Sequence, residues 1–357
     1  MSVNFRKILL IPVWCLVAVV AAAQTPAGYY DPANGLTGKA LQQALHDIID
    51  NHTSISYSEL WTAFKKTDKK PDGKVWDIYT DIPSGTPVYT FTFGTDQCGN
   101  YSVEGDCYNR EHSFPKSWFD DQTPMYTDLF HLYPTDGKVN GMRSDYPYGE
   151  TNSPTYTSSN GSKLGSCSVS GYTGIVFEPI DEYKGDLART YFYMATRYYG
   201  EDGSWSGSPM VTGSQPKAWA LTMLLQWSKD DPVSQKEINR NDSIYKIQHN
   251  RNPFIDYPLY ADMIWGSLSS TDDVISDEEG MTIYPNPASS YLTIALPADH
   301  ASDIVIQIYD FNGCLTKTVT TGETIPHIDI SDLKPGFYLL QVTSGKKRYT
   351  ERFVVVK

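Results

Sequence analysis

The chain has 357 residues, with 42 acidic and 29 basic side chains and a formal net charge of −13. This acidic balance excludes a protein that holds nucleic acid through a broadly basic surface, so nucleic-acid chemistry would need a local basic strip. The length is sufficient for two domains. None of the five cysteines shows the paired spacing that is typical of a zinc site.

The N-terminus has the pattern of an export signal. Arg6 and Lys7 precede an apolar run at 8–20, and Ala21–Ala23 forms a small-residue cleavage site. The apolar run is shorter than the roughly 20 residues that a membrane-spanning helix requires. We therefore expect residues 1–23 to be a signal peptide and the mature chain to be exported, without a membrane span and as a monomer.

The segment after the signal mixes helical and strand patterns without internal repeats, which favours one α+β domain over residues 24–268. Apolar residues at helical spacing predict a helix at 36–49 and a second helix near Trp61. Runs of β-branched and aromatic residues predict strands at 76–79 and 88–93.

Two cysteines are candidates for a disulfide. Cys98 and Cys107 are close in sequence, flank a turn of Gly, Asn and Tyr, and belong to a chain bound for an oxidising compartment. We expect them to be bonded to each other; two free buried thiols are the alternative, because connectivity cannot be deduced from sequence alone. Cys167 and Cys314 have no evident local partner.

A loop and a series of helices follow in the same domain. Residues 151–170 are rich in Ser, Thr, Asn and Gly, which predicts a long surface loop. Helices are then expected at 185–199, 218–227 and 234–248. The prolines of 252–258 end the series in a turn.

A polar, acidic segment without periodicity at 269–280 indicates a linker to a second domain at 281–357. Short runs rich in β-branched and aromatic residues alternate there with glycine-containing turns, which predicts a small all-β sandwich. The runs are Tyr291–Leu296, Ile304–Phe311, Phe337–Val342 and Arg352–Val356. The expected fold class is therefore α+β, followed by a small all-β sandwich.

The residues that can carry chemistry lie in two neighbouring stretches. One contains Glu111 and His112; the other, 128–144, contains Asn140 and Arg143. A glutamate oxygen and an asparagine carbonyl are hard ligands that suit Mg²⁺, and a neutral imidazole can take a proton from water near pH 7. This combination indicates metal-assisted hydrolysis of a phosphodiester. Taken alone, the first two residues could equally be a structural histidine and a solvated strand glutamate.

The expected local structure is strand, loop, strand, helix. A strand at 128–133, stopped by Pro134, precedes a helix that carries Asn140 and Arg143 three positions apart on one face. Adjacent side chains of a regular strand point to opposite faces. The glutamate and the histidine can therefore share one site only if the backbone at 111–112 is irregular, and we expect a bulge or strand end near Pro115 to supply this irregularity.

Four blocks of this sequence resemble the bacterial endonuclease I family of ββα-metal (His-Me finger) nucleases. The blocks are 109–119, 128–144, 177–189 and 248–254, in that order. The resemblance implies that His112 is the general base that activates water, while Glu111 and Asn140 hold Mg²⁺, with Ca²⁺ or Mn²⁺ as alternatives. It also implies cleavage of DNA, and often of RNA, with little sequence preference and 5′-phosphate products, because phosphate contacts carry no base information.

The chain departs from the family's pattern at three places. Phe130 stands where relatives often have histidine. The sequence Arg-Ser-Asp at 143–145 stands where Arg-Ser-Asn is usual, so Asp145 replaces an asparagine. Residues 120–127 contain no arginine, although similar enzymes clamp the phosphate with an arginine in this region. The basic residues that could substitute are Lys116, Arg110 and Arg143, of which Arg143 is taken as a catalytic candidate.

The final domain resembles the C-terminal sorting domain of the type IX (Por) secretion system. The motifs that carry this resemblance are Ile-Tyr-Pro-Asn-Pro-Ala at 283–288, Ile-Tyr-Asp-Phe-Asn-Gly at 308–313 and Leu-Lys-Pro-Gly-Phe-Tyr at 333–338. It implies passage across the outer membrane through that machinery, then release or attachment at the cell surface. A sandwich that binds a ligand or sugar is the alternative.

Several polar residues are expected to be structural. His131 lies in an apolar run and is expected to be a packed, hydrogen-bonded core residue. Asp186 and Arg189 are expected to form an intrahelical pair. The turn at 250–252 is expected to support the fold, with Arg251 as a candidate contact to phosphate. For the whole chain, the alternative to an enzyme is a secreted carbohydrate-binding or adhesin-like protein, suggested by the 26 Tyr and 8 Trp residues.

Overall fold

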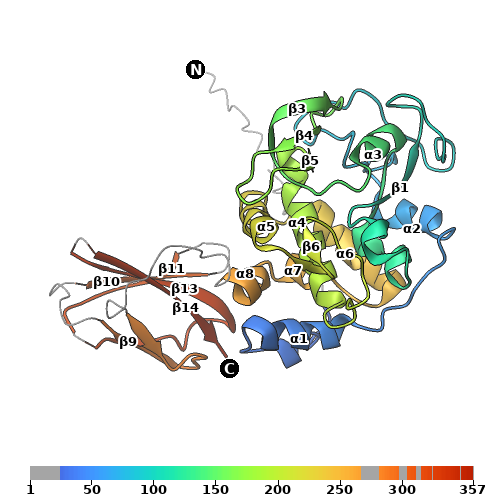
Figure 1. Cartoon of the computed structure of the whole chain (residues 1–357). Coiled ribbons are helices and arrows are strands. Elements are labelled where there is room, and N and C mark those ends of the chain that lie inside the picture. Colours follow the sequence, from blue (N-terminus) through green and yellow to red (C-terminus); the bar gives the residue numbers. More distant parts are fainter. Residues whose placement is uncertain are drawn as a thin grey trace, which may run out of the picture.

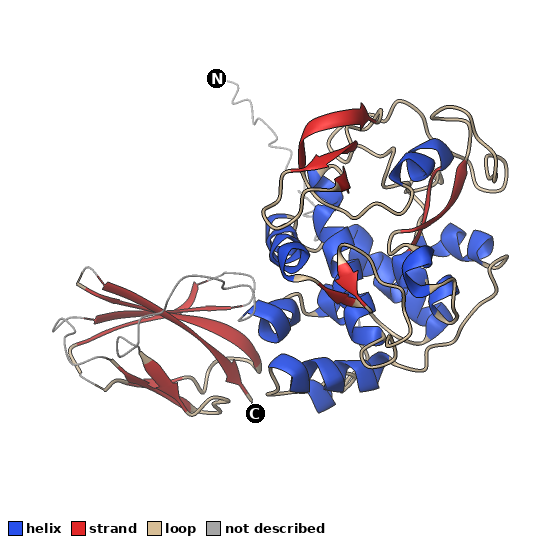
Figure 2. Cartoon of the chain, viewed as in Figure 1, coloured by secondary structure: helices blue, strands red, loops and turns tan. Residues whose placement is uncertain are grey.

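The computed structural model describes residues 25–266, 281–296, 304–310, 315–323, 325–345 and 347–356. The expected signal peptide (1–23) and linker (269–280) lie outside these ranges. The described residues form two bodies, each with its own apolar core (Figure 1). The larger body combines helices with short strands, whereas strands and loops build the smaller one (Figure 2), so the expected fold class is confirmed. Within the described ranges, no helix has the length and apolar character needed to cross a membrane.

Helices dominate the larger body, and one of them forms its centre. All residues of Gly185–Arg197 in helix α4 are buried, and α1, α5 and α7 pack against it. The helical periodicity of the sequence predicts this class of element well, because apolar residues such as Leu41 and Leu45 of α1 are the ones that become buried. The helices are α1 (Gly38–Ile49), α2 (Leu60–Thr67), α3 (Gly137–Arg143), α4 (Lys184–Arg197), α5 (Ala218–Asp230), α6 (Gln235–Gln248), α7 (Pro253–Asp256) and α8 (Leu259–Trp265).

Short antiparallel sheets complete the larger body. The strands are β1 (Tyr108–His112), β2 (Leu132–Asp136), β3 (Thr151–Thr157), β4 (Lys163–Cys167), β5 (Ile175–Glu178), β6 (Val211–Thr212) and β7 (Gln215–Pro216). The expected loop at 151–170 is therefore wrong for most of its length, since it contains β3 and β4. Its polar composition reflects the exposure of β3 on both of its faces, since four successive residues of the strand are exposed.

The strands expected at 76–79 and 88–93 do not form. Both segments are irregular, and their apolar residues serve packing instead: Ile78 and Phe91 are buried. Their backbone groups have other partners, such as the Trp76 amide, which donates to the Asp68 carbonyl. The β-branched and aromatic residues of these segments are therefore there because they pack in the core, and not because the segments belong to a sheet.

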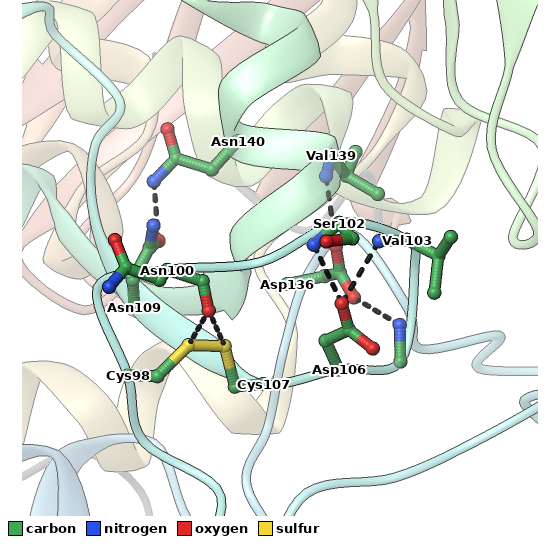
Figure 3. The surroundings of a disulfide bond; sticks show 11 residues. Cys98, Asn100, Ser102, Val103, Asp106, Cys107, Asn109, Asp136, Val139 and Asn140 are labelled. Carbon is green, nitrogen blue, oxygen red and sulfur yellow. Dashed lines mark hydrogen bonds between the residues drawn. A yellow bond between two sulfur atoms is a disulfide. The ribbon is translucent and has the colours of Figure 1, made fainter.

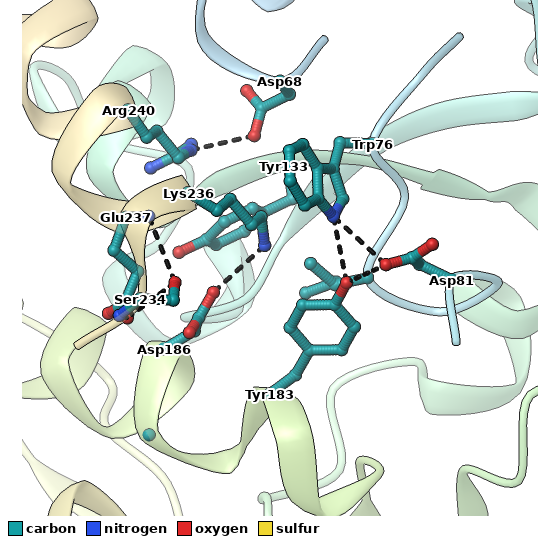
Figure 4. Close-up of polar contacts among 12 residues, drawn as sticks. Asp68, Trp76, Asp81, Tyr133, Tyr183, Asp186, Ser234, Lys236, Glu237 and Arg240 are labelled. Carbon is teal, nitrogen blue, oxygen red and sulfur yellow. Dashed lines mark hydrogen bonds and ion pairs between the residues drawn. The ribbon is translucent and has the colours of Figure 1, made fainter. Parts of the chain in front are cut away.

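Buried ion pairs join α4 to α6 (Figure 4). Lys236 donates to Asp186 at 3.0 Å, and Arg189 donates to both carboxylate oxygens of Glu237 at 2.5 and 2.9 Å. The expected Asp186–Arg189 pair exists at 3.7 Å, but each residue is closer to its partner on α6. A further pair, from Arg240 to Asp68 at 2.8 Å, ties α6 to the end of α2. These charges therefore fix the relative positions of the helices that surround the site.

The smaller body consists of two antiparallel sheets around an apolar core. One sheet has the order β11-β10-β13-β14 and the other β12-β9-β8. Along β10, buried residues alternate with partly exposed ones, as a sandwich requires. The expected strands are all present, whereas β8, β11 and β12 were not predicted. The strands are β8 (Thr282–Tyr284), β9 (Tyr291–Ala295), β10 (Ile304–Asp310), β11 (Leu315–Thr321), β12 (His327–Asp329), β13 (Gly336–Ser344) and β14 (Lys347–Val355).

Candidate active site

The candidate site is built on β1, β2 and α3, which follow one another as a ββα unit. Strands β1 and β2 pair antiparallel, and Asp136, the last residue of β2, caps α3 by accepting from the Val139 amide at 2.8 Å. Pro134 does not stop the strand as expected. It lies inside β2 opposite Arg110, and β2 has no second neighbour in its sheet, so the missing N–H leaves no ladder bond unmade.

Glu111 and His112 point in opposite directions from β1. The register with β2 continues without a bulge to His112, so the expected bulge is absent; the strand ends at this residue, three positions before Pro115. Glu111 contacts Arg143 and Tyr79, whereas His112 lies among aromatic rings on the other face. The carboxylate and the imidazole therefore have different neighbours in the described structure.

Arg143 holds the Glu111 carboxylate in place. Glu111 is 2% exposed, and its Oε1 accepts from Tyr79 and from Arg143 Nη1, each at 2.9 Å. Burial raises the pKa of this carboxyl, while Arg143 and Tyr79 act to lower it. Arg143 is fully buried and also donates to the carbonyls of His112 (2.8 Å) and Ser113 (2.6 Å). A guanidinium so enclosed orients Glu111 and cannot reach a phosphate without leaving these partners.

Asn140 reaches the same face of β1 from α3. Its Nδ2 donates to Asn109 Oδ1 at 2.7 Å (Figure 3), and Asn109 precedes Glu111 by two residues, which places both on one face of the strand. Glu111 accepts its hydrogen bonds through Oε1, and Asn140 donates its hydrogen bond through Nδ2. Within the described residues, Oε2 of Glu111 and Oδ1 of Asn140 are therefore left to bind a cation. One carboxylate and one neutral carbonyl suit Mg²⁺, which keeps several waters when bound.

A disulfide holds the loop beside this face. Cys98 and Cys107 are bonded, as expected from the sequence (Figure 3). The loop that they close is attached to the start of α3, because Gly105 donates to Asp136 Oδ2 at 2.7 Å and Gly137 donates to the Cys107 carbonyl at 2.9 Å. The disulfide therefore closes the loop in front of β1, and hydrogen bonds attach this loop to the start of the helix that carries Asn140.

The contact of His112 with the backbone defines its tautomer. Nε2 lies 3.1 Å from the carbonyl oxygen of Tyr126. A carbonyl can only accept, so Nε2 carries the proton and Nδ1 is the basic nitrogen. His112 is 6% exposed, and burial together with the neighbouring His131 holds its pKa well below the usual value. The imidazole is therefore neutral at physiological pH, as a general base must be.

All four residues of the 128–131 segment are buried. His131 is inaccessible to solvent and its Nε2 lies 2.7 Å from the Met125 carbonyl, which confirms its expected role in the core. Residues 129–131 form a 3-10 turn rather than the expected strand. Phe130 packs on Tyr193 with ring centroids 4.4 Å apart. This departure from the family's pattern therefore lies in the core and not in the site.

The basic residues differ in accessibility. Lys116 is exposed and pairs with Asp121, and Arg110 is half-buried with its guanidinium carbon 3.6 Å from the centre of the Tyr57 ring. Arg251 is 1% exposed and bonded to Asp256, so the suggested phosphate contact is wrong. The accessible candidates are therefore Lys116 and Arg110. Sequence reasoning missed four residues around the site, Tyr57, Tyr79, Asn109 and Tyr126; only Asn109 lies in a recognised block.

A second group of ligand atoms occurs elsewhere in the larger body. Among the described residues, His46, Asp50 and Glu201 place one donor atom each within 4.8 Å of one another. Arg197 Nη1 lies 2.7 Å from Asp50 and 3.2 Å from Glu201, so a guanidinium already neutralises these carboxylates. The three residues are therefore explained as an ion-pair cluster around Arg197. None of them belongs to the group formed by Glu111, Asn140 and Arg143.

Comparison with known proteins assigns a family to each of the two bodies. The endonuclease I family model matches residues 37–259, and a secretion system C-terminal sorting domain matches residues 282–356. An extracellular ribonuclease of Bacillus amyloliquefaciens is 39% identical over 254 residues, covering 70% of this chain and 81% of the relative. An extracellular ribonuclease of Bacillus subtilis (strain 168) is 39% identical over 245 residues, covering 66% and 78%. An extracellular deoxyribonuclease of Aeromonas hydrophila is 27% identical over 253 residues, covering 68% and 95%. The chain therefore belongs to the endonuclease I family and ends in a sorting domain that directs it to secretion or to the cell surface.

Proposed function

We propose that this protein is a secreted, metal-dependent endonuclease that hydrolyses phosphodiester bonds with little sequence preference and leaves 5′-phosphates. The proposed substrate is DNA, and RNA is a second one; relatives of the chain are named as nucleases of both kinds. The observation that carries the proposal is the neutral His112, with Nε2 held by a backbone carbonyl, on the same strand as Glu111 and next to the helix of Asn140.

His112 acts as the general base. Its Nδ1 takes a proton from the attacking water, and the Tyr126 carbonyl, already bonded to Nε2–H, stabilises the imidazolium that forms. The low pKa makes Nδ1 available without prior deprotonation but also makes it a weak base, so the charge of a bound phosphate is needed to favour the protonated form.

Glu111 and Asn140 would hold the divalent cation. When bound, Mg²⁺ would supply charge stabilisation for the pentacoordinate phosphorus and the leaving 3′ oxygen. Arg143 keeps Glu111 oriented, and the Asn109 side chain turns the Asn140 carbonyl away from itself. His112, at the end of β1, and the Glu111–Asn140 pair would thereby serve the same phosphate, the first in proton transfer and the second in cation binding.

Substrate contacts are expected to be few and local. Lys116 and Arg110 are the accessible cations near His112, and contacts to phosphate alone carry no sequence information. The mature protein acts as a monomer outside the cell, after passage through the secretion machinery that reads the C-terminal domain.

The proposal is tested with the purified mature chain on plasmid DNA and on RNA. We expect cleavage with Mg²⁺, none with EDTA, and a loss of at least about 10³-fold in rate for His112→Ala, because general-base catalysis and water orientation are both removed. Asn239→Ala, on the exposed face of α6, is the matched control. Cleavage that persists in EDTA, or in the folded His112→Ala variant at the parental rate, would contradict the proposal.

A further inference from the structure

An open cavity of about 480 Å³ lies beside His112 and is not used by the proposed reaction. Its walls come from the loop before α2 and from the loop between β1 and β2. Tyr57 and Tyr126 are its aromatic residues, and Ser54, Ser56 and Thr123 add hydroxyl groups. The volume falls in the range of pockets that hold small organic ligands.

The two tyrosines and the histidine form a cluster of rings. The Tyr57 and Tyr126 centroids are 4.7 Å apart with planes inclined by 32°. The His112 ring lies 5.2 Å from Tyr126 and 6.2 Å from Tyr57, nearly parallel to the latter. Both tyrosines are only half-buried. A planar group that enters the cavity therefore meets partly exposed aromatic rings directly next to the general base.

Positive charges flank the rings. The Arg110 guanidinium covers Tyr57 at 3.6 Å and Trp61 at 4.4 Å, and Lys116 Nζ lies 5.6 Å from the Tyr126 ring centre. Lys65 is exposed one helical turn after Trp61 on α2. In a chain of net charge −13, these three side chains place positive charge beside the cavity, although Lys116 also pairs with Asp121 and Arg110 donates to the Tyr57 carbonyl. Rings bordered by cations complement a base bordered by phosphates.

We propose that this cavity is a nucleobase subsite in which an unpaired base of a single-stranded nucleic acid stacks on Tyr126, whose ring is supported from behind by Tyr57. The neighbouring phosphates then lie toward Arg110 and Lys116, and the hydroxyl groups of the cavity contact the edge of the base or the sugar. Stacking on aromatic rings tolerates all bases, which agrees with low sequence preference. Bases of a duplex are already stacked and paired, so the subsite favours single strands. The inference rests on the proposed function and specifies its substrate.

The test measures binding of fluorescent oligonucleotides to the mature chain in EDTA, with probe integrity checked on a gel. Three probes of equal length are used: a single strand, its duplex, and a single strand with abasic positions. The variants are Tyr57→Ala and Tyr126→Ala, with the phenylalanine variants at both positions as rescue. Tyr126→Ala keeps the backbone carbonyl that binds His112. Tyr172→Ala is the matched control, because Tyr172 is a half-buried tyrosine that stacks on Trp219 at 4.8 Å and does not line the cavity.

The alanine variants are expected to bind the single strand about tenfold more weakly, or worse, and the duplex and abasic probes within about twofold of the parent. The phenylalanine variants should bind as the parent does, since they keep the rings. Equal loss on all three probes, or no loss on any, would overturn the subsite. If His112→Ala abolishes cleavage while the tyrosine variants bind normally, the subsite fails and the nuclease stands. If no nucleic acid is cleaved but single strands bind through the rings, the nuclease fails and the subsite stands.

Discussion

At the scale of single residues, burial assigns roles that residue type leaves open. Arg143 and Lys116 are both cations close to the site in sequence, yet one is fully buried against Glu111 and the other is exposed. The buried arginine holds the Glu111 carboxylate in place, and the exposed lysine pairs with Asp121 at the surface. His112 and His131 differ similarly: both hydrogen-bond to carbonyls of one loop, and His131 alone is completely enclosed.

Replacing Arg143 by methionine should damage both stability and catalysis. The change leaves the Glu111 carboxylate buried without its cation, which costs about 3–5 kcal/mol in unfolding free energy. Urea unfolding measures this loss, and cleavage rates should fall by at least about tenfold because Glu111 is no longer oriented. The double variant Glu111→Gln/Arg143→Met should be more stable than Arg143→Met alone. Equal stability of the two variants would show that the carboxylate is not the origin of the cost.

At the scale of elements, one buried carboxylate joins the turn before β2 to two helices. Asp128 accepts from the Phe130 amide, from Tyr193 and Tyr198 of the α4 region, and from Gln248 of α6. Burial raises its pKa, but the charges of nearby histidines and these donors outweigh burial and leave the pKa at about 2. Burial also lowers the pKa values of those histidines, His52 and His131, so near neutral pH the hydroxyl and amide donors stabilise the carboxylate.

Asp128→Asn should therefore make stability less sensitive to acid. The folded pKa lies below the unfolded value of about 3.9, so the carboxylate contributes stability above pH 4 that is lost as the pH falls toward 2. The gap in unfolding free energy between parent and variant should shrink by about 2–3 kcal/mol between pH 5 and pH 2. Urea unfolding across this range measures it. The exposed Asp72→Asn serves as control, and a gap that stays constant with pH would contradict the assignment.

At the scale of the whole molecule, the two bodies have separate cores and separate tasks. The core of the larger body surrounds α4, and that of the smaller body lies between its two sheets. Contact between them includes the rings of Tyr260 and Phe337, with centroids 6.2 Å apart. We propose that residues 24–268 and 281–357 are independent domains, joined by the linker at 269–280, and that the second serves export alone.

Deletion of residues 281–357 should consequently leave the nuclease intact. We expect kcat/KM on DNA to stay within about twofold of the parent, since no residue of the candidate site belongs to the smaller body. In the producing cell, the truncated protein should stop behind the outer membrane, which cell fractionation and activity assays on the medium detect. Secretion of the truncated chain at parental levels would refute the role of the tail.

The sequence by itself determined the family, the ββα order and most helices, and it proposed the disulfide that the structure confirms. Motif spacing and helical periodicity are local properties, and the same apolar residues that define α1 and α4 become buried. The strands predicted at 76–79 and 88–93 do not form, because β-branched and aromatic residues also pack in cores that are not sheets. Only the folded path of the chain shows whether such a segment pairs with another strand.

Tertiary structure alone decided how the site is divided. The sequence indicated that Glu111 and His112 face apart on a regular strand, and the structure decided that the pairing of β1 with β2 reaches His112 without a bulge. The backbone carbonyl of Tyr126 selects the basic nitrogen of His112, and Tyr57 arrives from a loop more than fifty residues earlier to complete the ring cluster. Contacts between distant segments depend on the folded path of the chain, so the sequence named the candidate groups whereas the fold set their orientation and their neighbours.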